Sequence, residues 1–396
     1  LMKDQYPELA EHRDLIASIT EQEEVRFRAT IERGLSLLDT LFGTMEQQQR
    51  TELAGTDAFR LYDTYGFPKD LTEVICRERG YTVDEAGFQT AMEEAKARSV
   101  FAGMDQAVEQ VYRLALEKVD GASVQFTGYE REVDRSAVVA LIREGELVDA
   151  ASAEQAVEVV TARTPFYGEA GGQLGDTGEI RVGEARVRVE DTQKPIPGLI
   201  VHRGRVERGE LRVGQEAELC IDVERRDSIR RCHSATHLLH LGLRAVIGKH
   251  ATQKGSVVGP ERFRFDFTSN RAVTPDEIRR IEDMVNERVL GNAPVVTEVL
   301  TMEQARQRGA MMIFEEKYGD EVRMVSMADS RELCGGTHVR ATGDIGLFKI
   351  LSEQGIAAGV RRAQFFDGGV GSVAVGPERA VQQIARADDE NERDEA

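Results

Sequence analysis

Two short motifs that lie about a hundred residues apart constrain the fold of this chain more than any other feature. His233 and His237 are four positions apart, and so are Cys334 and His338. Three imidazoles and one thiolate form a set of ligands that zinc prefers. If all four side chains bind one metal ion, the fold must bring the two distant segments together.

The sequence around each motif predicts its local structure. Residues 229–246 carry many leucines and predict a helix, on which residues four positions apart lie on the same face. Gly335 and Gly336 disfavour a helix interior, so we expect the second motif on a tight loop or at the start of a helix.

The histidine motif alone has other interpretations. Histidines on a leucine-rich helix often serve packing and hydrogen bonding instead of metal binding. His240 lies near the same face, so the spacing does not exclude it as a ligand. Zinc proteases with the HExxH motif are disfavoured, because Ser234 stands where their mechanism needs a glutamate base.

The charge balance argues against binding of nucleic acid through bulk charge alone. The chain of 396 residues has 51 lysines and arginines against 70 aspartates and glutamates, a net charge of −19. Any RNA contact must therefore be local. A basic zone surrounds the histidine motif, although a run of charges is as often a solvated surface. Its basic residues are Arg225, Arg226, Arg230, Arg231, Arg244, Lys249, Lys254, Arg262 and Arg264.

The cysteines and the ends of the chain bear on its compartment. Cys76, Cys220, Cys232 and Cys334 show no pairing pattern, and we find no signal peptide or long apolar span. A reducing cytoplasm is therefore expected, with no membrane contact. The chain begins within a pattern and ends in an acidic stretch, so we expect a fragment of a larger protein. The sequence leaves the oligomeric state of this fragment open, and a monomer is one candidate.

Composition along the chain predicts four regions. Residues 1–105 are expected to be helical, and residues 106–220 to form a β-barrel-like domain with a glycine-rich loop. Residues 221–370 are expected to form an α+β domain that carries both metal motifs. Residues 371–396 are expected to be an acidic tail or the start of a linker helix. The predicted fold class is therefore multi-domain α+β.

Local patterns make these regions more specific. In the helical region Asp70 follows a turn at 63–68 and is expected to cap the next helix. Arginines alternate with phenylalanines over 262–267, which predicts a strand with one buried face. Thr274 and Glu277 form a capping box, which predicts the start of a helix.

A glycine-rich loop and a glutamine are further candidate site features. Residues 166–176 carry Gly171, Gly172 and Gln173, which could bring backbone amides and one amide side chain close to a ligand. Gln253 precedes an expected strand and could contact a small polar group. An ordinary turn and a surface glutamine are the plainer interpretations.

Several segments together resemble the middle and editing portion of bacterial alanyl-tRNA synthetases. The resemblance extends from about Tyr6 to Val373. The segments are 60–68, 166–176, 233–240, 253–255, 334–338, 342–346 and 357–362. The two metal motifs alone also fit the editing domain of threonyl-tRNA synthetases and free-standing alanyl-editing proteins, and the helical N-terminal markers favour the synthetase.

The resemblance implies a zinc site with a hydrolytic role. His233, His237, Cys334 and His338 would bind one Zn²⁺, at a site that removes serine or glycine from mischarged tRNA(Ala). Gln253, Thr236 and Cys334 would serve in catalysis. Such proofreading is needed because an alanine pocket discriminates against glycine and serine by only ~1–3 kcal/mol.

The resemblance also implies contacts with the acceptor stem and the aminoacylated 3′ end of tRNA(Ala). The candidates are Asp63 and Asp70 for a G·U pair in the stem, and Gly171, Gly172, Gln173, Lys254, Arg361 and Arg362 elsewhere. In the family the full enzyme ligates alanine to tRNA with ATP and Mg²⁺. We find none of its class II motifs, so we expect the aminoacylation core to be absent and the fragment to act as a deacylase.

Two other functions fit the same residues. A module that binds the tRNA acceptor stem with a purely structural zinc would hydrolyse nothing. A general metal-dependent hydrolase would act on small esters or peptides without tRNA.

Overall fold

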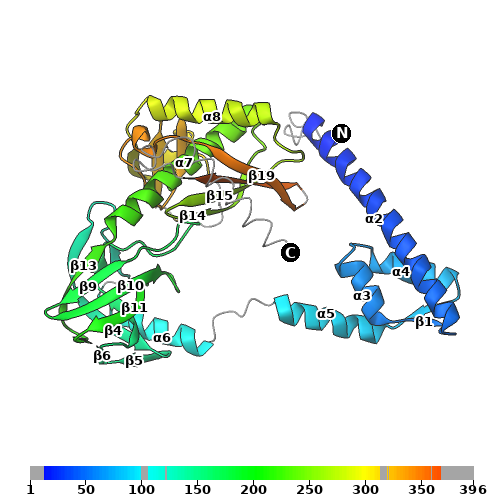
Figure 1. Cartoon of the computed structure of the whole chain (residues 1–396), viewed down its shortest axis with the longest axis horizontal. Coiled ribbons are helices and arrows are strands. Elements are labelled where there is room, and N and C mark those ends of the chain that lie inside the picture. Colours follow the sequence, from blue (N-terminus) through cyan, green and yellow to red (C-terminus); the bar gives the residue numbers. More distant parts are fainter. Residues whose placement is uncertain are drawn as a thin grey trace, which may run out of the picture. The chain divides into compact units, whose positions relative to one another are not determined.

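The computed structural model describes residues 13–99, 106–120, 123–312, 319, 321–357 and 359–366. The chain divides into two compact units, Leu1–Asp105 and Gln106–Ala396, whose elements are labelled in Figure 1. The predicted tail at 371–396 lies outside the described residues. Among the described residues, none of the helices combines the length and the apolar content that crossing a bilayer requires.

The first unit is mainly helical, as predicted for this part of the chain. Its helices pack on an apolar core that includes Leu38, Phe42 and Phe67. A Cβ atom at Gly34 would lie 1.9 Å from the Phe67 ring, so glycine is needed there for the ring to pack. The elements in chain order are α2 (Arg13–Gln47), β1 (Glu52–Leu53), α3 (Gly55–Asp63), α4 (Lys69–Glu78), β2 (Thr82–Val83) and α5 (Glu85–Ser99).

Asp70 does not cap α4, contrary to the prediction. The helix begins two residues earlier than a cap at Asp70 would place it, and Pro68 occupies the N-cap position. No side chain among the described residues makes a capping hydrogen bond there. Asp70 lies within the first turn, where its charge still interacts favourably with the helix dipole. Asp63 is the last residue of α3, and both carboxylates are exposed.

The second unit begins with α6 (Gln106–Glu117), followed by a barrel-like antiparallel sheet. Six strands form a closed ring in the order β13-β9-β10-β11-β7-β4, because β13 also pairs with β4, and β5 extends the sheet. The prediction of a barrel-like sheet is confirmed. The strands are β4 (Val133–Arg143), β5 (Glu146–Val148), β7 (Ala156–Thr161), β9 (Gly178–Val182), β10 (Ala185–Gln193), β11 (Val201–Arg208) and β13 (Glu216–Ile221). The short strands beside them are β3 (Gln125–Phe126), β6 (Ala150–Ser152), β8 (Arg163–Thr164) and β12 (Glu210–Arg212).

Alternating side chains explain why these segments close into a barrel. Along the first half of β4, buried and exposed or half-buried residues alternate, as in a strand with one face toward a core. Val138, Val159, Ile180 and Leu219 from four strands share one apolar cluster inside the ring. Closure leaves the six strands without an unpaired edge in the ring.

The chain passes directly from the barrel into α7 (Val223–Val246), the helix of the histidine motif. Asp222 begins it, since its side chain accepts a hydrogen bond from the amide of Arg225 at 3.0 Å. The helix predicted over 229–246 is confirmed and is longer by almost two turns at its N-terminal end.

Two small sheets and α8 (Pro275–Leu290) pack around α7. The predicted capping box is present, because Thr274 and Glu277 bond to each other's backbone amides at the start of α8. The predicted one-sided strand is β15, whose three phenylalanines are buried. One sheet has the order β14 (Gln253–Val258), β15 (Arg262–Thr268), β20 (Val360–Phe366) and β19 (Ile350–Ala357). The other has β16 (Val296–Thr301), β17 (Glu321–Met327) and β18 (Ser330–Leu333), with α9 (Met302–Gln307) and the 3-10 helix η2 (Thr342–Ile345) beside them.

Candidate metal centre

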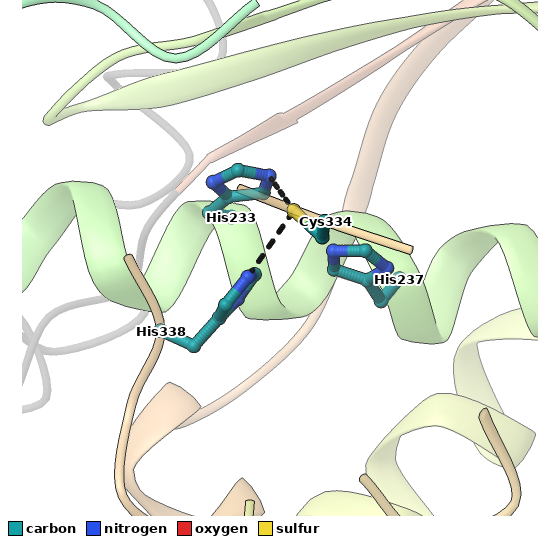
Figure 2. A group of neighbouring side chains, drawn as sticks. All are labelled: His233, His237, Cys334 and His338. Carbon is teal, nitrogen blue, oxygen red and sulfur yellow. Dashed lines mark hydrogen bonds between the residues drawn. The ribbon is translucent and has the colours of Figure 1, made fainter. Parts of the chain in front are cut away.

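The two sequence motifs meet in the second unit. His233 and His237 project from α7, and Cys334 and His338 lie on the loop that follows β18 (Figure 2). Their ligand atoms all lie within 4.8 Å of one another. The Sγ atom of Cys334 is 3.4 Å from Nε2 of His233 and 3.4 Å from Nε2 of His338. These four side chains could hold a metal ion.

The donor set fits zinc. With Zn–S of about 2.3 Å and Zn–N of about 2.0 Å, neighbouring ligands of a tetrahedral site lie roughly 3.5 Å apart. Both sulfur–nitrogen distances agree with that spacing. Nε2 of His237 is buried and has no hydrogen-bond partner among the described residues, although such atoms are normally paired. A metal ion in the centre of the group would satisfy it.

The surroundings prepare the cysteine to be a ligand. Burial alone would raise the pKa of the Cys334 thiol, but His233, His338 and His237 around it lower that pKa well below its usual value. Burial lowers the pKa of His338 to about 3, so this imidazole is neutral. A thiolate and neutral imidazoles are the forms that bind zinc. Burial would lower the pKa of His237, but Glu332 and Cys334 raise it to about 10, so this imidazole would have to release a proton when the metal binds.

Each of the three histidines is held through its second ring nitrogen. Nδ1 of His233 lies 2.8 Å from Oε1 of Gln173, and Nδ1 of His237 lies 2.6 Å from a carboxylate oxygen of Glu332. Nδ1 of His338 lies 3.3 Å from the hydroxyl of Ser234. With Nδ1 engaged in this way, Nε2 of each ring faces the centre of the group, which is the arrangement common in zinc sites.

Glu332 is a site residue that the sequence analysis missed. It is buried, and its second oxygen accepts a hydrogen bond from Nδ1 of His240 at 3.0 Å. Burial would raise its pKa, but His237 and His240 lower it to about 2, so Glu332 is ionised. His240 lies outside the group of four ligands and orients Glu332 instead. The signal was the alternation in β18, which places Glu332 on the same buried face as Ser330.

The loop that carries Cys334 is fixed through its backbone. Arg323 donates to the carbonyl oxygens of Cys334 at 2.9 Å and Gly336 at 2.8 Å. The hydroxyl of Tyr129 donates to the carbonyl of Gly335 at 2.7 Å. A Cβ atom at Gly336 would lie 2.0 Å from Cε1 of His233, so only glycine fits against that ring.

The glycine-rich loop at 166–176 supports the metal centre from the barrel. Gln173 is fully buried, accepts from the amide of Thr337 at 2.9 Å and donates to its hydroxyl at 3.0 Å. Gly172 has a positive φ of 88° and lies against Ser256, where a Cβ atom would be 2.5 Å from the carbonyl oxygen. Gly172 and Gln173, both predicted to contact tRNA, therefore contact other parts of the protein instead. Gly171 differs, because a Cβ atom there would meet nothing within 4 Å.

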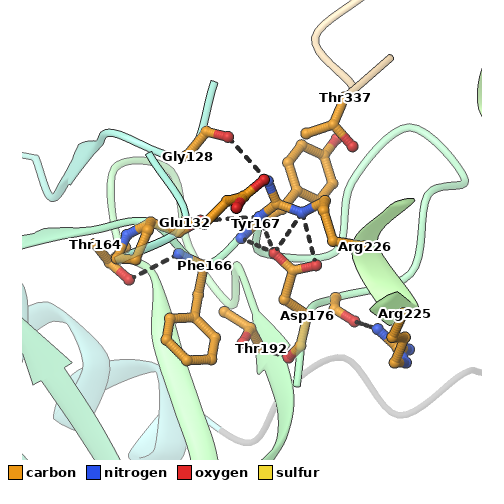
Figure 3. A network of polar contacts seen from close by, with 12 residues as sticks. Gly128, Glu132, Thr164, Phe166, Tyr167, Asp176, Thr192, Arg225, Arg226 and Thr337 are labelled. Atoms are coloured by element: carbon orange, nitrogen blue, oxygen red, sulfur yellow. Dashed lines mark hydrogen bonds and ion pairs between the residues drawn. The ribbon is translucent and has the colours of Figure 1, made fainter. Parts of the chain in front are cut away.

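A buried ion pair joins the end of this loop to α7. The Arg226 guanidinium binds Asp176 and also donates to the carbonyls of Gly128 and Pro165, both at 2.9 Å (Figure 3). The amide of Tyr167 donates to Asp176 at 2.6 Å. Because Arg226 is fully buried, it is not part of the basic surface that the sequence predicted.

Other residues of that basic zone also have partners. Arg230 pairs with Asp227 and Glu132, and Arg244 donates to the carbonyl of Lys249. Lys254 is exposed.

The remaining candidate residues lie in several places. Thr236 donates its hydroxyl to the carbonyl of Cys232 on its own helix at 2.9 Å, and Gln253 donates to the hydroxyl of Ser256 at 3.0 Å. Arg361 is paired with Glu353, and Arg362 with Asp266. The roles predicted for these residues stay predictions.

Comparison with known proteins identifies the family. Residues 1–225 match the family model described as tRNA synthetases class II (A). The chain belongs to this family. Residues 322–362 of the chain also match the model of the threonyl and alanyl tRNA synthetase second additional domain, and these residues include Cys334 and His338.

Relatives of the chain include three proteins named alanine--tRNA ligase. The chain is 52% identical over 374 residues to the one from Sorangium cellulosum (strain So ce56), 49% over 378 residues to the one from Anaeromyxobacter sp. (strain Fw109-5), and 48% over 376 residues to the one from Chelativorans sp. (strain BNC1). These matches cover 91–92% of this chain but only 41–42% of the relatives. The chain thus spans about two fifths of their length.

The family match corrects three predictions. We expected tRNA-recognition and editing domains without the class II aminoacylation core, but residues 1–225 match the class II model, so that region is represented in this chain. The same match contradicts the predicted function, which was removal of serine and glycine from tRNA(Ala), with an isolated binding module as the alternative. It also contradicts the prediction that the chain acts as a deacylase. The prediction rested on the absence of short class II motifs, whereas the match extends along residues 1–225.

Proposed function

We propose that this chain belongs to an alanine--tRNA ligase, and that the protein containing it joins alanine to tRNA(Ala) with ATP. The observation that carries the proposal is 52% identity along 91% of the chain to an enzyme of that name. The match of residues 322–362 to a domain named for threonyl and alanyl synthetases supports the same choice within the class II family. ATP with Mg²⁺ would be ligands of the class II region, and the reaction belongs to the cytoplasm, where tRNA is charged.

We propose further that His233, His237, Cys334 and His338 bind one Zn²⁺ per chain. The spacing of the ligand atoms, the lowered pKa of Cys334 and the unpaired Nε2 of His237 support zinc. Four protein ligands make a closed site, so the ion would tie α7 to the loop after β18. Gln173, Glu332 and Ser234 would orient the histidines around it.

tRNA(Ala) would be the macromolecular partner, and the acceptor stem with its 3′ end the part contacted. Among the predicted contact residues, Asp63, Asp70 and Lys254 are exposed side chains that could reach an RNA. Arg361 and Arg362 are engaged with carboxylates, so RNA contact would have to compete with these ion pairs. We therefore favour Lys254 over the two arginines.

The test of this function is alanylation. The protein containing this chain, incubated with alanine, ATP and tRNA(Ala), is expected to accumulate alanyl-tRNA, and omission of ATP is expected to abolish it. A tRNA for another amino acid is the matched control and should stay uncharged. A folded protein with full zinc content that forms no alanyl-tRNA would overturn the proposal.

A further inference from the structure

A pocket of about 220 Å³ opens next to the metal centre. His338 lies in its wall, so the pocket and the metal group share a residue. The side chains that matter for its chemistry come from the barrel, from α7, and from β16, β17 and the loop after β18. They are Tyr129, Arg230, Thr297, Arg323, His338 and Arg340.

The charge of this pocket is opposite to that of the whole chain. The described residues that line it include three arginines and no carboxylate, in a chain of net charge −19. Arg230 is offset by Asp227 at 2.7 Å and Glu132 at 3.2 Å. Neither Arg323 nor Arg340 forms an ion pair with a carboxylate among the described residues, and Arg323 donates to backbone carbonyls instead. The pocket therefore attracts an anion locally.

The donors around the pocket suit a phosphate oxygen. Guanidinium groups bind phosphate in paired, charge-assisted hydrogen bonds. The hydroxyl of Thr297, which accepts a hydrogen bond from Arg323 at 3.4 Å, can donate a neutral one. Small-molecule and cofactor sites usually have volumes of about 300–1,000 Å³. The smaller volume here suits one phosphate and the atoms attached to it better than a whole cofactor.

We propose that this pocket binds one phosphodiester group of an RNA strand, and that Arg340 is its main exposed contact. RNA as the source of the phosphate rests on the proposed function, which gives the chain a tRNA partner. Free phosphate offers the same chemistry, and the experiment below separates the two sources.

The test uses the zinc-loaded 396-residue chain and tRNA(Ala). Arg340→Gln removes one charge from an exposed side chain, so folding and zinc content should be unchanged. We expect the Kd for tRNA to rise roughly 3- to 10-fold, and the slope of log K against log salt to fall by about 1. The matched control is Arg306→Gln, an exposed arginine on α9 outside the pocket, which should change neither quantity. Arg340→Lys keeps the charge and should restore most of the binding and the slope. An Arg340→Gln variant with the parent's Kd and salt slope would overturn the proposal.

A second measurement identifies the source of the phosphate. The NMR signal of the Arg340 side-chain Nε–H group is followed while inorganic phosphate or tRNA(Ala) is added. We expect tRNA to move this signal at concentrations near its Kd and inorganic phosphate to move it only at much higher concentration. Movement with phosphate alone would overturn RNA as the ligand and assign the pocket to a small anion. If the parent protein forms alanyl-tRNA but Arg340→Gln binds tRNA with the parent's affinity, only the phosphate pocket is refuted. If the parent protein forms no alanyl-tRNA, only the proposed function is refuted.

Discussion

The guanidinium carbon of Arg323 lies 4.1 Å from the centre of the Tyr129 ring. Arg323 belongs to β17, whereas Tyr129 lies between β3 and β4 of the barrel region, and both bind the backbone of the loop that carries Cys334. The barrel region is therefore joined to the loop of the metal centre through this pair.

Removing the hydroxyl of Tyr129 should weaken metal binding. Tyr129→Phe keeps the ring under Arg323 but loses the hydrogen bond to the Gly335 carbonyl, a bond worth about 0.5–1.5 kcal/mol. We expect zinc affinity to fall by roughly 2- to 12-fold in a competition with a coloured chelator. Tyr62→Phe, on an exposed tyrosine of the first unit, is the control. Equal affinity in both variants would show that the bond does not position the loop.

The two glycines of the cysteine motif should respond differently to alanine. Gly336→Ala places a methyl group against the His233 ring, so that ring must move and zinc affinity should fall by roughly 10-fold or more. Gly335→Ala should bind zinc normally, because a Cβ atom there meets nothing within 4 Å. Zinc per chain, with circular dichroism to verify folding, measures both. Normal zinc content in Gly336→Ala would contradict the geometry of His233.

Gln173 should matter for metal affinity although it binds no metal itself. Gln173→Leu leaves Nδ1 of His233 and the amide of Thr337 without their acceptor, and losses of this kind cost roughly 10- to 100-fold in metal affinity. Gln253→Leu is the matched control, since that amide bonds only Ser256 in the described structure. Zinc competition measures both, and equal losses in the two variants would exclude a specific role for Gln173.

The buried ion pair between Arg226 and Asp176 should control the stability of the second unit. Arg226→Met leaves a buried carboxylate without its partner, which costs about 3–5 kcal/mol of the free energy of unfolding. Arg225→Met, at the half-buried neighbour that bonds the Gly175 carbonyl, should cost about 1 kcal/mol. Urea unfolding measures both variants. A cost of less than 1 kcal/mol for Arg226→Met would mean that Asp176 gains water or a proton in the variant.

The start of α8 should make stability depend on pH. Hydrogen bonds from Arg271 and Thr274 lower the pKa of Glu277 from 4.5 to about 2. A carboxylate with a lowered pKa in the folded state stabilises the protein above pH 4.5, and this stabilisation is lost as the pH falls from 4.5 toward 2. Glu277→Gln should therefore lower stability by about 1 kcal/mol at pH 7, with the difference shrinking below pH 4.5. Thermal unfolding of Glu277→Gln and the parent at pH 7 and below pH 4.5 tests this pH dependence. Asp276→Asn, in the same turn, is the control.

The sequence predicted the parts of the site that depend on local spacing. The histidine helix, the Thr274 capping box and the one-sided strand β15 follow from local periodicity or capping, and the cysteine loop follows from its two glycines. Asp70 was wrongly predicted as a cap, because Pro68 already starts α4. Pro68 and Asp70 both lie where an N-cap could be, and the sequence alone did not show which of them takes that position.

The sequence did not predict the contacts that hold the histidines. Gln173 is 60 residues from His233, and Glu332 is 95 residues from His237. Their roles arise only when the loop at 166–176 and β18 pack on α7, and no spacing rule connects them. The family was reached from motifs, but the class II region was missed because its likeness is spread over residues 1–225.

The distance along the chain between the two halves of the metal centre has a consequence for synthesis. Cys334 follows His233 by 101 residues, so a bound ion closes a long loop of polypeptide, and the entropy of closing a loop grows only slowly with its length. While the chain is being made, α7 can form and its two histidines can hold a metal only weakly. The tight site is completed late, after β18 and the residues up to His338 have left the ribosome, so a shortage of metal would be felt at the end of folding and not at its beginning.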